Sequence, residues 1–299
     1  MNYKTLSLDT AGYLFTNRIH IFLMPALLTY FWNLDAGLAL PFKYYLMITF
    51  TTAGGYIYNM ATDEAEDAIN YSARYRLFGS GAADTMATTR AAVVICFIMG
   101  FVLALPAGWV FVLYGGVVNF LGSLYSRPLR FGAGRPFRIK EIPLLKNLYA
   151  GVFWSVALVL TPYLYVDARP GQLALLTILI SLGLNYFVEL MWDLRDMRGD
   201  RQAGVRTLPL VLGEAPACWI LRAVHCATCL LMLWGVQRGL LLETKGLVTA
   251  ALYFPLGVIF LEWYRHLHDK TWASHLYILC AGAITLVAML SQSLLARGV

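Results

Sequence analysis

The sequence has few charged residues and few cysteines, and each shortage argues against a class of protein. Only 13% of the 299 residues are charged, 59% are hydrophobic, and the mean hydropathy is +0.63. A soluble domain carries about twice that charged fraction, and its surface-to-volume ratio limits the apolar area that it can bury. The five cysteines lie in apolar segments and include one CxxC pair, Cys226 and Cys229, with no second pair to complete a zinc site. We therefore predict an integral, multi-pass membrane protein rather than a soluble enzyme or a zinc domain.

Apolar stretches long enough to cross a bilayer recur along the whole chain. A helix of about 20 residues spans about 30 Å of hydrocarbon. By this criterion we predict an all-α membrane protein with nine transmembrane helices, and residues 1–299 form one domain. The predicted segments are about 17–37, 42–60, 86–106, 108–126, 145–165, 171–194, 215–237, 246–264 and 273–295.

Lysine and arginine are shared unequally between the two sets of loops that these helices leave. The N-terminus and the loops after the even-numbered helices hold sixteen of them, whereas the opposite loops hold five. The positive-inside rule places the first set in the cytoplasm, together with the N-terminus. This distribution accounts for the net charge of +6, and no basic stretch with interleaved aromatics indicates a nucleic-acid partner.

The second predicted helix ends in three regularly spaced polar residues, Asn59, Asp63 and Asp67. Positions i, i+4 and i+8 share one helix face, so the two carboxylates point the same way and repel each other. A cation between them removes this repulsion. Mg²⁺ prefers hard oxygen ligands, often one or two carboxylates, and completes its shell with water and substrate phosphate oxygens. We predict that these three residues bind Mg²⁺ and that both aspartates are catalytic.

The sixth predicted helix ends in a second pair of aspartates, Asp196 and Asp200, again four residues apart. One such pair is commonly a solvated acidic cap, but two pairs on one membrane face favour a shared metal site. We predict that Asp196 and Asp200 are also catalytic Mg²⁺ ligands, facing the first motif across a cavity. Glu189 and Asp193 precede them on the same helix, and either is a candidate for accepting a final proton. A buried structural partner for an arginine is the alternative role for Glu189.

Basic residues follow the first motif and flank the start of the fifth predicted helix. They are Arg74, Arg76, Lys140 and Lys146. Cations beside carboxylates are typical of a diphosphate site, because Mg²⁺ neutralises part of the ligand's charge and lysine or arginine the rest. A single arginine in these loops is equally typical of a basic cytoplasmic surface. We predict that these four side chains bind a diphosphate.

The two motifs resemble those of the UbiA superfamily of intramembrane prenyltransferases, over nearly the whole chain. In that family NDxxDxxxD follows the second helix and DxxxD the sixth. Residues 193–209 are similar to the family's D-x-x-D-x-x-x-D-x-x-x-G-x-x-T-L-P run, and Tyr125-Ser126 looks like the start of its YSxPPxRLK region. Two positions depart from the pattern, since Met60 replaces an aspartate and Pro128-Leu129 replaces a pair of prolines. The resemblance implies that Tyr125 contributes to substrate binding.

The resemblance also implies a helical bundle around a central cavity and a reaction. That reaction is Mg²⁺-dependent transfer of a prenyl group from an isoprenyl diphosphate, through an allyl cation, to a lipophilic or aromatic acceptor. Two alternatives stay open. A membrane terpene cyclase uses the same metal site but lets the cation attack its own chain, and an ion-coupled transporter uses carboxylates for coupling. Transporters place such groups near the bilayer midplane, whereas these lie at helix ends.

Overall fold

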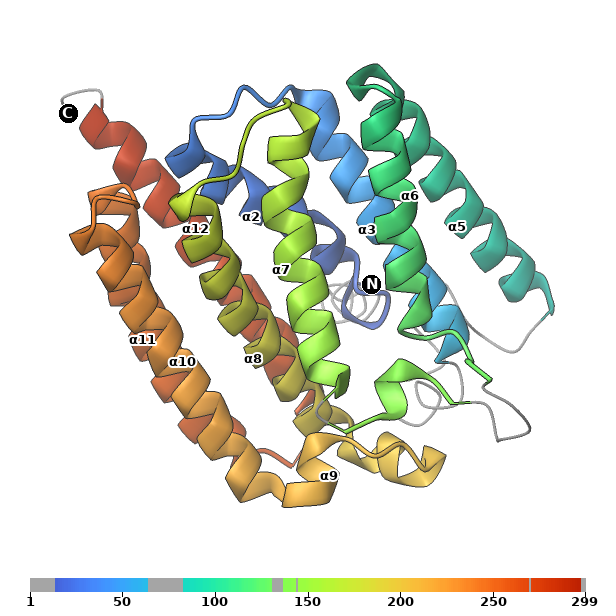
Figure 1. Cartoon of the computed structure of the whole chain (residues 1–299). Helices are drawn as coiled ribbons and strands as arrows, with labels where there is room; N and C mark the ends of the chain where they lie inside the picture. The colour runs from blue at the N-terminus through green and yellow to red at the C-terminus, as the bar shows by residue number, and fades with distance from the viewer. Residues whose placement is uncertain (1–13, 64–82, 131–136, 144, 269, 297–299) are drawn as a thin grey trace, which may run out of the picture. The chain divides into compact units, whose positions relative to one another are not determined.

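The computed structural model describes residues 14–63, 83–130, 137–143, 145–268 and 270–296, which are mainly helical (Figure 1). Within these ranges there is no β-strand, only an isolated bridge between Leu129 and Phe137. Each predicted apolar segment coincides with a helix, and the all-α class is therefore confirmed. The helices are α2 (Ile19–Ala36), α3 (Phe42–Thr62), α5 (Ala83–Ala104), α6 (Trp109–Leu124), α7 (Leu145–Tyr165), α8 (Gln172–Ala203), α10 (Glu214–Gln237), α11 (Glu243–Tyr264) and α12 (Thr271–Ala296), with a short α9 (Leu208–Leu212) between α8 and α10.

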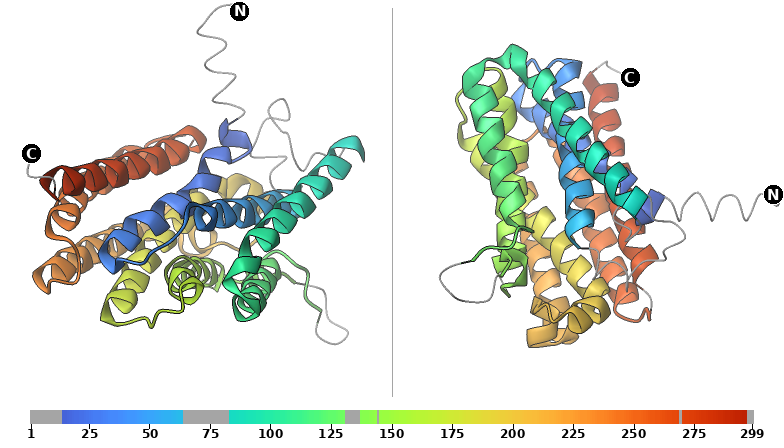
Figure 2. Two further views of the ribbon diagram at one scale, coloured as in Figure 1. Left: turned by 90° about the horizontal axis from the view of Figure 1, so that it is seen from above. Right: turned by 90° about the vertical axis from the view of Figure 1, so that its right-hand side faces the viewer.

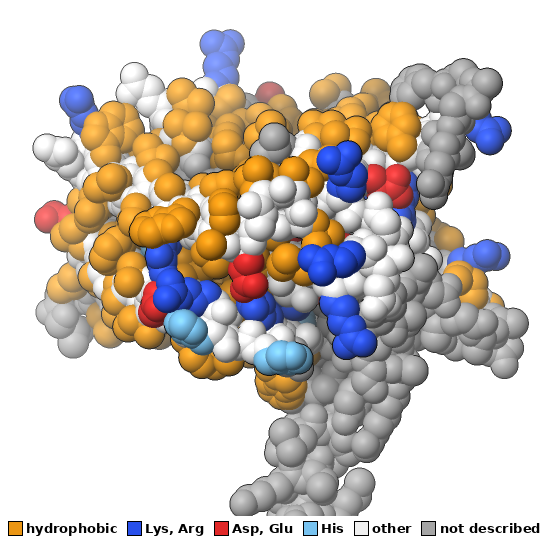
Figure 3. Space-filling view, turned by 90° about the horizontal axis from the view of Figure 1, so that it is seen from below, with side chains coloured by type: hydrophobic (Ala, Val, Ile, Leu, Met, Phe, Trp, Pro, Cys, Tyr) orange, Lys and Arg blue, Asp and Glu red, His pale blue; other side chains and the backbone are white. Residues whose placement is uncertain are grey.

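Six helices in the described part of the chain are long and apolar enough to cross a membrane. They correspond to α5, α7, α8, α10, α11 and α12. Large hydrophobic side chains are exposed to an extent that a soluble monomer does not tolerate; Trp109, Val110 and Ile259, for example, are 71%, 82% and 69% exposed. Hydrophobic side chains also occupy much of the surface drawn in Figure 3. The count of nine spans and the central cavity stay predictions.

Helix α8 continues past the predicted boundary at residue 194 and ends at Ala203. Hydropathy marks only its apolar part, whereas the helix itself stops where Gly204 adopts the left-handed region at φ +73°. The N–H of Val205 donates to the Asp200 carbonyl at 2.8 Å, and that of Gly204 to the Arg201 carbonyl at 3.4 Å. This pattern is a Schellman cap. The second aspartate motif therefore lies in the last two turns of a helix.

The chain divides into two compact units. The first comprises Met1–Ala26, Pro41–Ile142 and Asp196–Thr207, and the second comprises Leu27–Leu40, Pro143–Arg195 and Leu208–Val299. That the whole chain forms one domain stays a prediction.

In the first unit, α3 and α5 lie side by side (Figures 1 and 2). Small residues allow this close approach, because a Cβ added to Gly100 would lie 2.5 Å from Thr51 Cγ2 and one added to Gly54 would lie 3.2 Å from Cys96 Cβ. Thr51 is not free to rotate away, since its hydroxyl donates to the Met47 carbonyl at 2.8 Å. Glycine at such contacts is typical of helices that pack within a membrane.

In the second unit, a buried ion pair lies within the hydrophobic core. The Lys245 ammonium binds the Asp35 carboxylate and donates to the Phe31 carbonyl at 2.8 Å, and Lys245 is 1% exposed. The other Asp35 oxygen accepts the Leu242 N–H at 2.8 Å. Lys245 lies just before the apolar segment predicted at about 246–264, but α11 begins at Glu243 and includes Lys245 in its first turn. These hydrogen bonds and the ion pair replace the water contacts that the two charged groups lose on burial.

Replacing Gly100 by alanine is expected to lower the thermal unfolding midpoint of the detergent-purified protein. The added methyl group meets Thr51, and overpacking of this kind costs about 1–3 kcal/mol. Gly116→Ala in α6 is the matched control, because nothing lies within 4 Å of its added Cβ and alanine is the better helix former. The control should unfold at the wild-type temperature or above. Equal midpoints for the two variants would argue against a tight α3–α5 contact.

Candidate functional site

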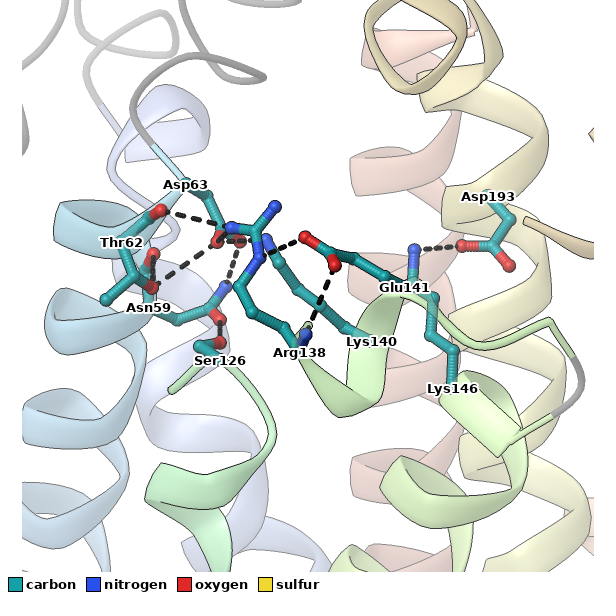
Figure 4. Close-up of polar contacts among 9 residues, drawn as sticks. All are labelled: Asn59, Thr62, Asp63, Ser126, Arg138, Lys140, Glu141, Lys146 and Asp193. Carbon is teal, nitrogen blue, oxygen red and sulfur yellow. Dashed lines mark hydrogen bonds and ion pairs between the residues drawn. The ribbon is translucent and has the colours of Figure 1, made fainter. Parts of the chain in front are cut away.

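At the end of α3, the side chain of Asn59 binds and orients the carboxylate of Asp63. Asp63 caps the helix, and the Asn59 amide donates to Asp63 Oδ2 at 2.8 Å (Figure 4). The Asn59 oxygen accepts the hydroxyl of Ser126, which is buried at the end of α6. The Thr62 hydroxyl donates to the Asn59 carbonyl at 2.9 Å. Both ends of the Asn59 amide are therefore engaged, and its side chain orients the Asp63 carboxylate.

The segment after α6 folds back so that its basic residues reach the same place. Leu129 and Phe137 exchange backbone hydrogen bonds of 2.7 and 2.9 Å, and the Lys140 N–H donates to the Tyr125 carbonyl at 3.2 Å. Tyr125 is the C-cap residue of α6. Its backbone therefore helps to position Lys140, and a direct role of its ring in substrate binding stays a prediction.

Two cations from this segment face Asp63. The Lys140 ammonium donates to Asp63 Oδ1, and Lys140 is 5% exposed. Arg138 Nη1 lies 3.9 Å from the same oxygen. Glu141 braces that arginine, because its carboxylate accepts from Arg138 Nε at 2.6 Å and from the Arg138 N–H at 3.1 Å. We call this group, with Asn59 and Ser126, the Asp63 cluster.

The start of α7 and the polar end of α8 form a second group in the other unit. The Lys146 ammonium donates to Asp193 Oδ1 (Figure 4). The Asn147 amide donates to Asp193 Oδ2 at 2.9 Å. Asp193 and Asn147 are both 0% exposed. We call these three residues the Asp193 cluster. It joins two predicted site residues to Asn147, to which the sequence analysis assigned no role.

The predicted carboxylates of α8 share one face of a continuous helix. Glu189, Asp193, Asp196 and Asp200 follow one another at intervals of four, three and four residues, which is the spacing of a single helical stripe. Asp200 is buried, at 6% exposed, whereas Glu189 and Asp196 are partly exposed. The Schellman cap ends the helix directly after this stripe.

Three predicted site residues, Asp67, Arg74 and Arg76, lie outside the described residues. Among those that are described, no three His, Cys, Asp or Glu side chains are close enough to hold a metal ion by themselves. Mg²⁺ needs fewer, since one or two carboxylates suffice when water and substrate phosphates complete its shell. The hard oxygen donors at the ends of α3 and α8 fit that requirement.

Ser126, Asn147 and Glu141 were not predicted as site residues. Ser126 contacts a residue 67 positions away and Asn147 one 46 positions away, so no local pattern announces either contact. Glu141 did leave a signal, because an arginine and a glutamate three residues apart in a helical turn commonly pair.

Comparison with known proteins supports the resemblance. Residues 22–290 match the UbiA prenyltransferase family. A curated relative, the digeranylgeranylglyceryl phosphate synthase of Pyrococcus horikoshii, is 26% identical over 122 residues, which are 40% of this chain and 39% of that protein. The matched region is thus well under half of that relative's length.

Two solved structures share the fold. A UbiA homologue from Archaeoglobus fulgidus, bound to GPP and Mg²⁺, has a TM-score of 0.63 and 16% identity, covering 94% of this chain and 99% of that one. A UbiA homologue from Aeropyrum pernix K1, solved in the apo form, has a TM-score of 0.67 and 16% identity, covering 91% and 98%. These likenesses establish the fold, and the family match over residues 22–290 establishes more: the chain is a multi-pass membrane protein that belongs to the UbiA prenyltransferase family.

Proposed function

We propose that this protein is a Mg²⁺-dependent prenyltransferase that moves a prenyl group from an isoprenyl diphosphate to a lipophilic or aromatic acceptor. The observation that carries the proposal is the family match over residues 22–290, which spans both aspartate motifs. The Archaeoglobus fulgidus homologue was solved with GPP and Mg²⁺, a substrate and a metal that suit the carboxylates and lysines found here. From the loop charges we also propose that the site and the N-terminus face the cytoplasm.

Oxygen atoms of the two aspartate motifs would hold the metal. The proposed ligands are Asn59, Asp63, Asp67, Asp196 and Asp200. When bound there, Mg²⁺ supplies positive charge that offsets the charge of the departing diphosphate. The ligands come from helix ends rather than helix centres, which favours an enzyme over an ion-coupled transporter.

Basic side chains would bind the remaining diphosphate charge. Lys140 and Lys146 are each held by an aspartate, so their ammonium groups are oriented before substrate arrives. Preorganised donors of this kind stabilise developing negative charge without reorganising during the reaction. Arg74, Arg76 and Tyr125 complete the proposed set.

The hydrocarbon part of the reaction depends on keeping water away. Cleavage of the allylic C–O bond leaves a cation that water would quench, so the prenyl chain must lie in a dry environment. The exposed apolar faces of the helices provide contact with lipid, and aromatic faces such as those of Tyr149 and Phe153, stacked with centroids 6.4 Å apart, stabilise cations. The acceptor then forms a bond to the cation, and the proton that the acceptor loses passes to a carboxylate, for which the sequence offers Glu189 and Asp193.

Asp63→Asn and Asp196→Asn are each expected to abolish Mg²⁺-dependent release of diphosphate from a prenyl diphosphate. Each change removes a negative charge that the metal requires. Asp167→Asn is the control, because Asp167 lies between α7 and α8 with φ +53°, a backbone conformation that asparagine also accepts. The effect is measured as the amount of diphosphate that each purified protein releases from the prenyl diphosphate in the presence of Mg²⁺. Full activity in both site variants would refute the metal assignment.

The same ionisation step would serve a terpene cyclase, and product analysis separates the two functions. The purified protein is incubated with Mg²⁺ and farnesyl or geranylgeranyl diphosphate, without acceptor, and the hexane extract is analysed by gas chromatography and mass spectrometry. A transferase is expected to give no cyclic hydrocarbon and to form product only when an acceptor is added. A cyclic hydrocarbon or a terpene alcohol that disappears without Mg²⁺ would instead identify a cyclase.

A further inference from the structure

We propose that Asp193 is a positioning residue, which holds the Lys146 ammonium for the diphosphate and does not take the final proton. This inference rests on the proposed function and deepens it. It assigns different roles to two carboxylates on one face of α8 and leaves Glu189 as the remaining candidate base.

Both oxygens of Asp193 are already engaged. Oδ1 accepts from Lys146 and Oδ2 accepts from Asn147 at 2.9 Å, and Asp193 is 0% exposed. Figure 4 shows the Lys146 ammonium pointing toward the Asp193 carboxylate from the start of α7. Since the two donors are consecutive residues of one helix, the carboxylate is tied to the first turn of α7 at two points.

This surrounding makes Asp193 a poor proton acceptor. A general base must lie within about 2.6–3.2 Å of the proton that it removes, directly or through one water. A substrate proton cannot come this close to Asp193, because the carboxylate is fully buried and its two oxygens contact an ammonium and an amide. Protonation would also leave the Lys146 charge beside a neutral acid, and breaking a buried ion pair in this way is strongly unfavourable.

The same surrounding suits the orientation of a lysine. The Lys146 side chain has a flexible four-carbon stem and three N–H donors. Asp193 accepts a hydrogen bond from one of these donors and thereby fixes the position of the ammonium. The Lys146 side chain remains 15% exposed while the Asp193 side chain is 0% exposed, so a ligand can contact the lysine but not the aspartate.

The Asp63 cluster repeats this arrangement atom for atom. There, a lysine ammonium binds Oδ1 of the aspartate and an asparagine amide binds Oδ2, at 2.8 Å. In the Asp193 cluster the corresponding amide lies at 2.9 Å. They differ in burial, because the Asp63 side chain is 12% exposed and the Asp193 side chain is 0% exposed, so a metal ion can reach Asp63 but not Asp193.

The test measures Mg²⁺-dependent diphosphate release from geranylgeranyl diphosphate without acceptor, because this step precedes any proton loss. Asp193→Asn and Lys146→Met are each expected to lower kcat/KM for release by about 10- to 100-fold, as displacement of a positioned group by about 1 Å does. The double variant should be no worse than the single ones, since both changes remove the same interaction. If Asp193→Asn releases diphosphate at the wild-type rate and alters only the later product, Asp193 is the base and the proposal is wrong.

Two further variants separate positioning from folding. Asn147→Ala keeps both charges but frees the carboxylate, and it should lower kcat/KM by a smaller factor. Asn185→Ala is its matched control on α8, because that amide donates to the Ser181 carbonyl at 2.9 Å and to the Ser155 hydroxyl at 3.3 Å; it should leave kcat/KM unchanged. Rates are taken per folded protein, with folding followed by thermal unfolding. An equal loss in Asn147→Ala and Asn185→Ala would indicate a structural role only.

The wild-type protein distinguishes failure of this inference from failure of the proposed function. Without Mg²⁺-dependent release in the wild type, the prenyltransferase proposal itself is wrong. With normal release in both the wild type and Asp193→Asn, only the role of Asp193 is wrong.

Discussion

Taking a carboxylate out of water costs several kcal/mol unless a cation and hydrogen-bond donors replace its lost hydration. In a chain that is 59% hydrophobic, this constraint decides where acidic residues can lie and which basic residues must lie beside them. Three ion pairs offset this cost of burying a carboxylate: Asp35–Lys245, Asp63–Lys140 and Asp193–Lys146. In the first, a backbone N–H completes the carboxylate shell and the lysine is 1% exposed. In the other two an asparagine amide does so.

The helices could be predicted because bilayer thickness dictates their length, and each apolar run coincides with one. Their ends were harder to predict. Helix α8 runs past its apolar part to a cap at Gly204, where a backbone conformation rather than hydropathy decides the boundary. Lys245 lies just outside the apolar segment predicted at about 246–264, and its buried position depends on Asp35, which no local pattern reveals.

In the candidate site, too, some residues could be predicted from the sequence and others could not. The charged residues were visible because carboxylates at i, i+4 and nearby lysines form a chemical pattern, and the structure brings Asp63 to Lys140 and Asp193 to Lys146. The neutral members, Ser126 and Asn147, carry no such pattern. Their role follows from contacts between segments far apart in the chain, which only the folded arrangement creates.

The Asp35–Lys245 pair has a consequence for how the protein is made. The two residues are separated by 210 positions, and a ribosome adds about 5–20 residues per second. Asp35 therefore waits roughly 10–40 s for its partner to be synthesised. Throughout that interval the Asp35 carboxyl either stays in contact with water or headgroups or carries a proton, because burying an unpaired carboxylate is too costly. The ion pair in the core of the second unit can therefore form only after α11 has been synthesised.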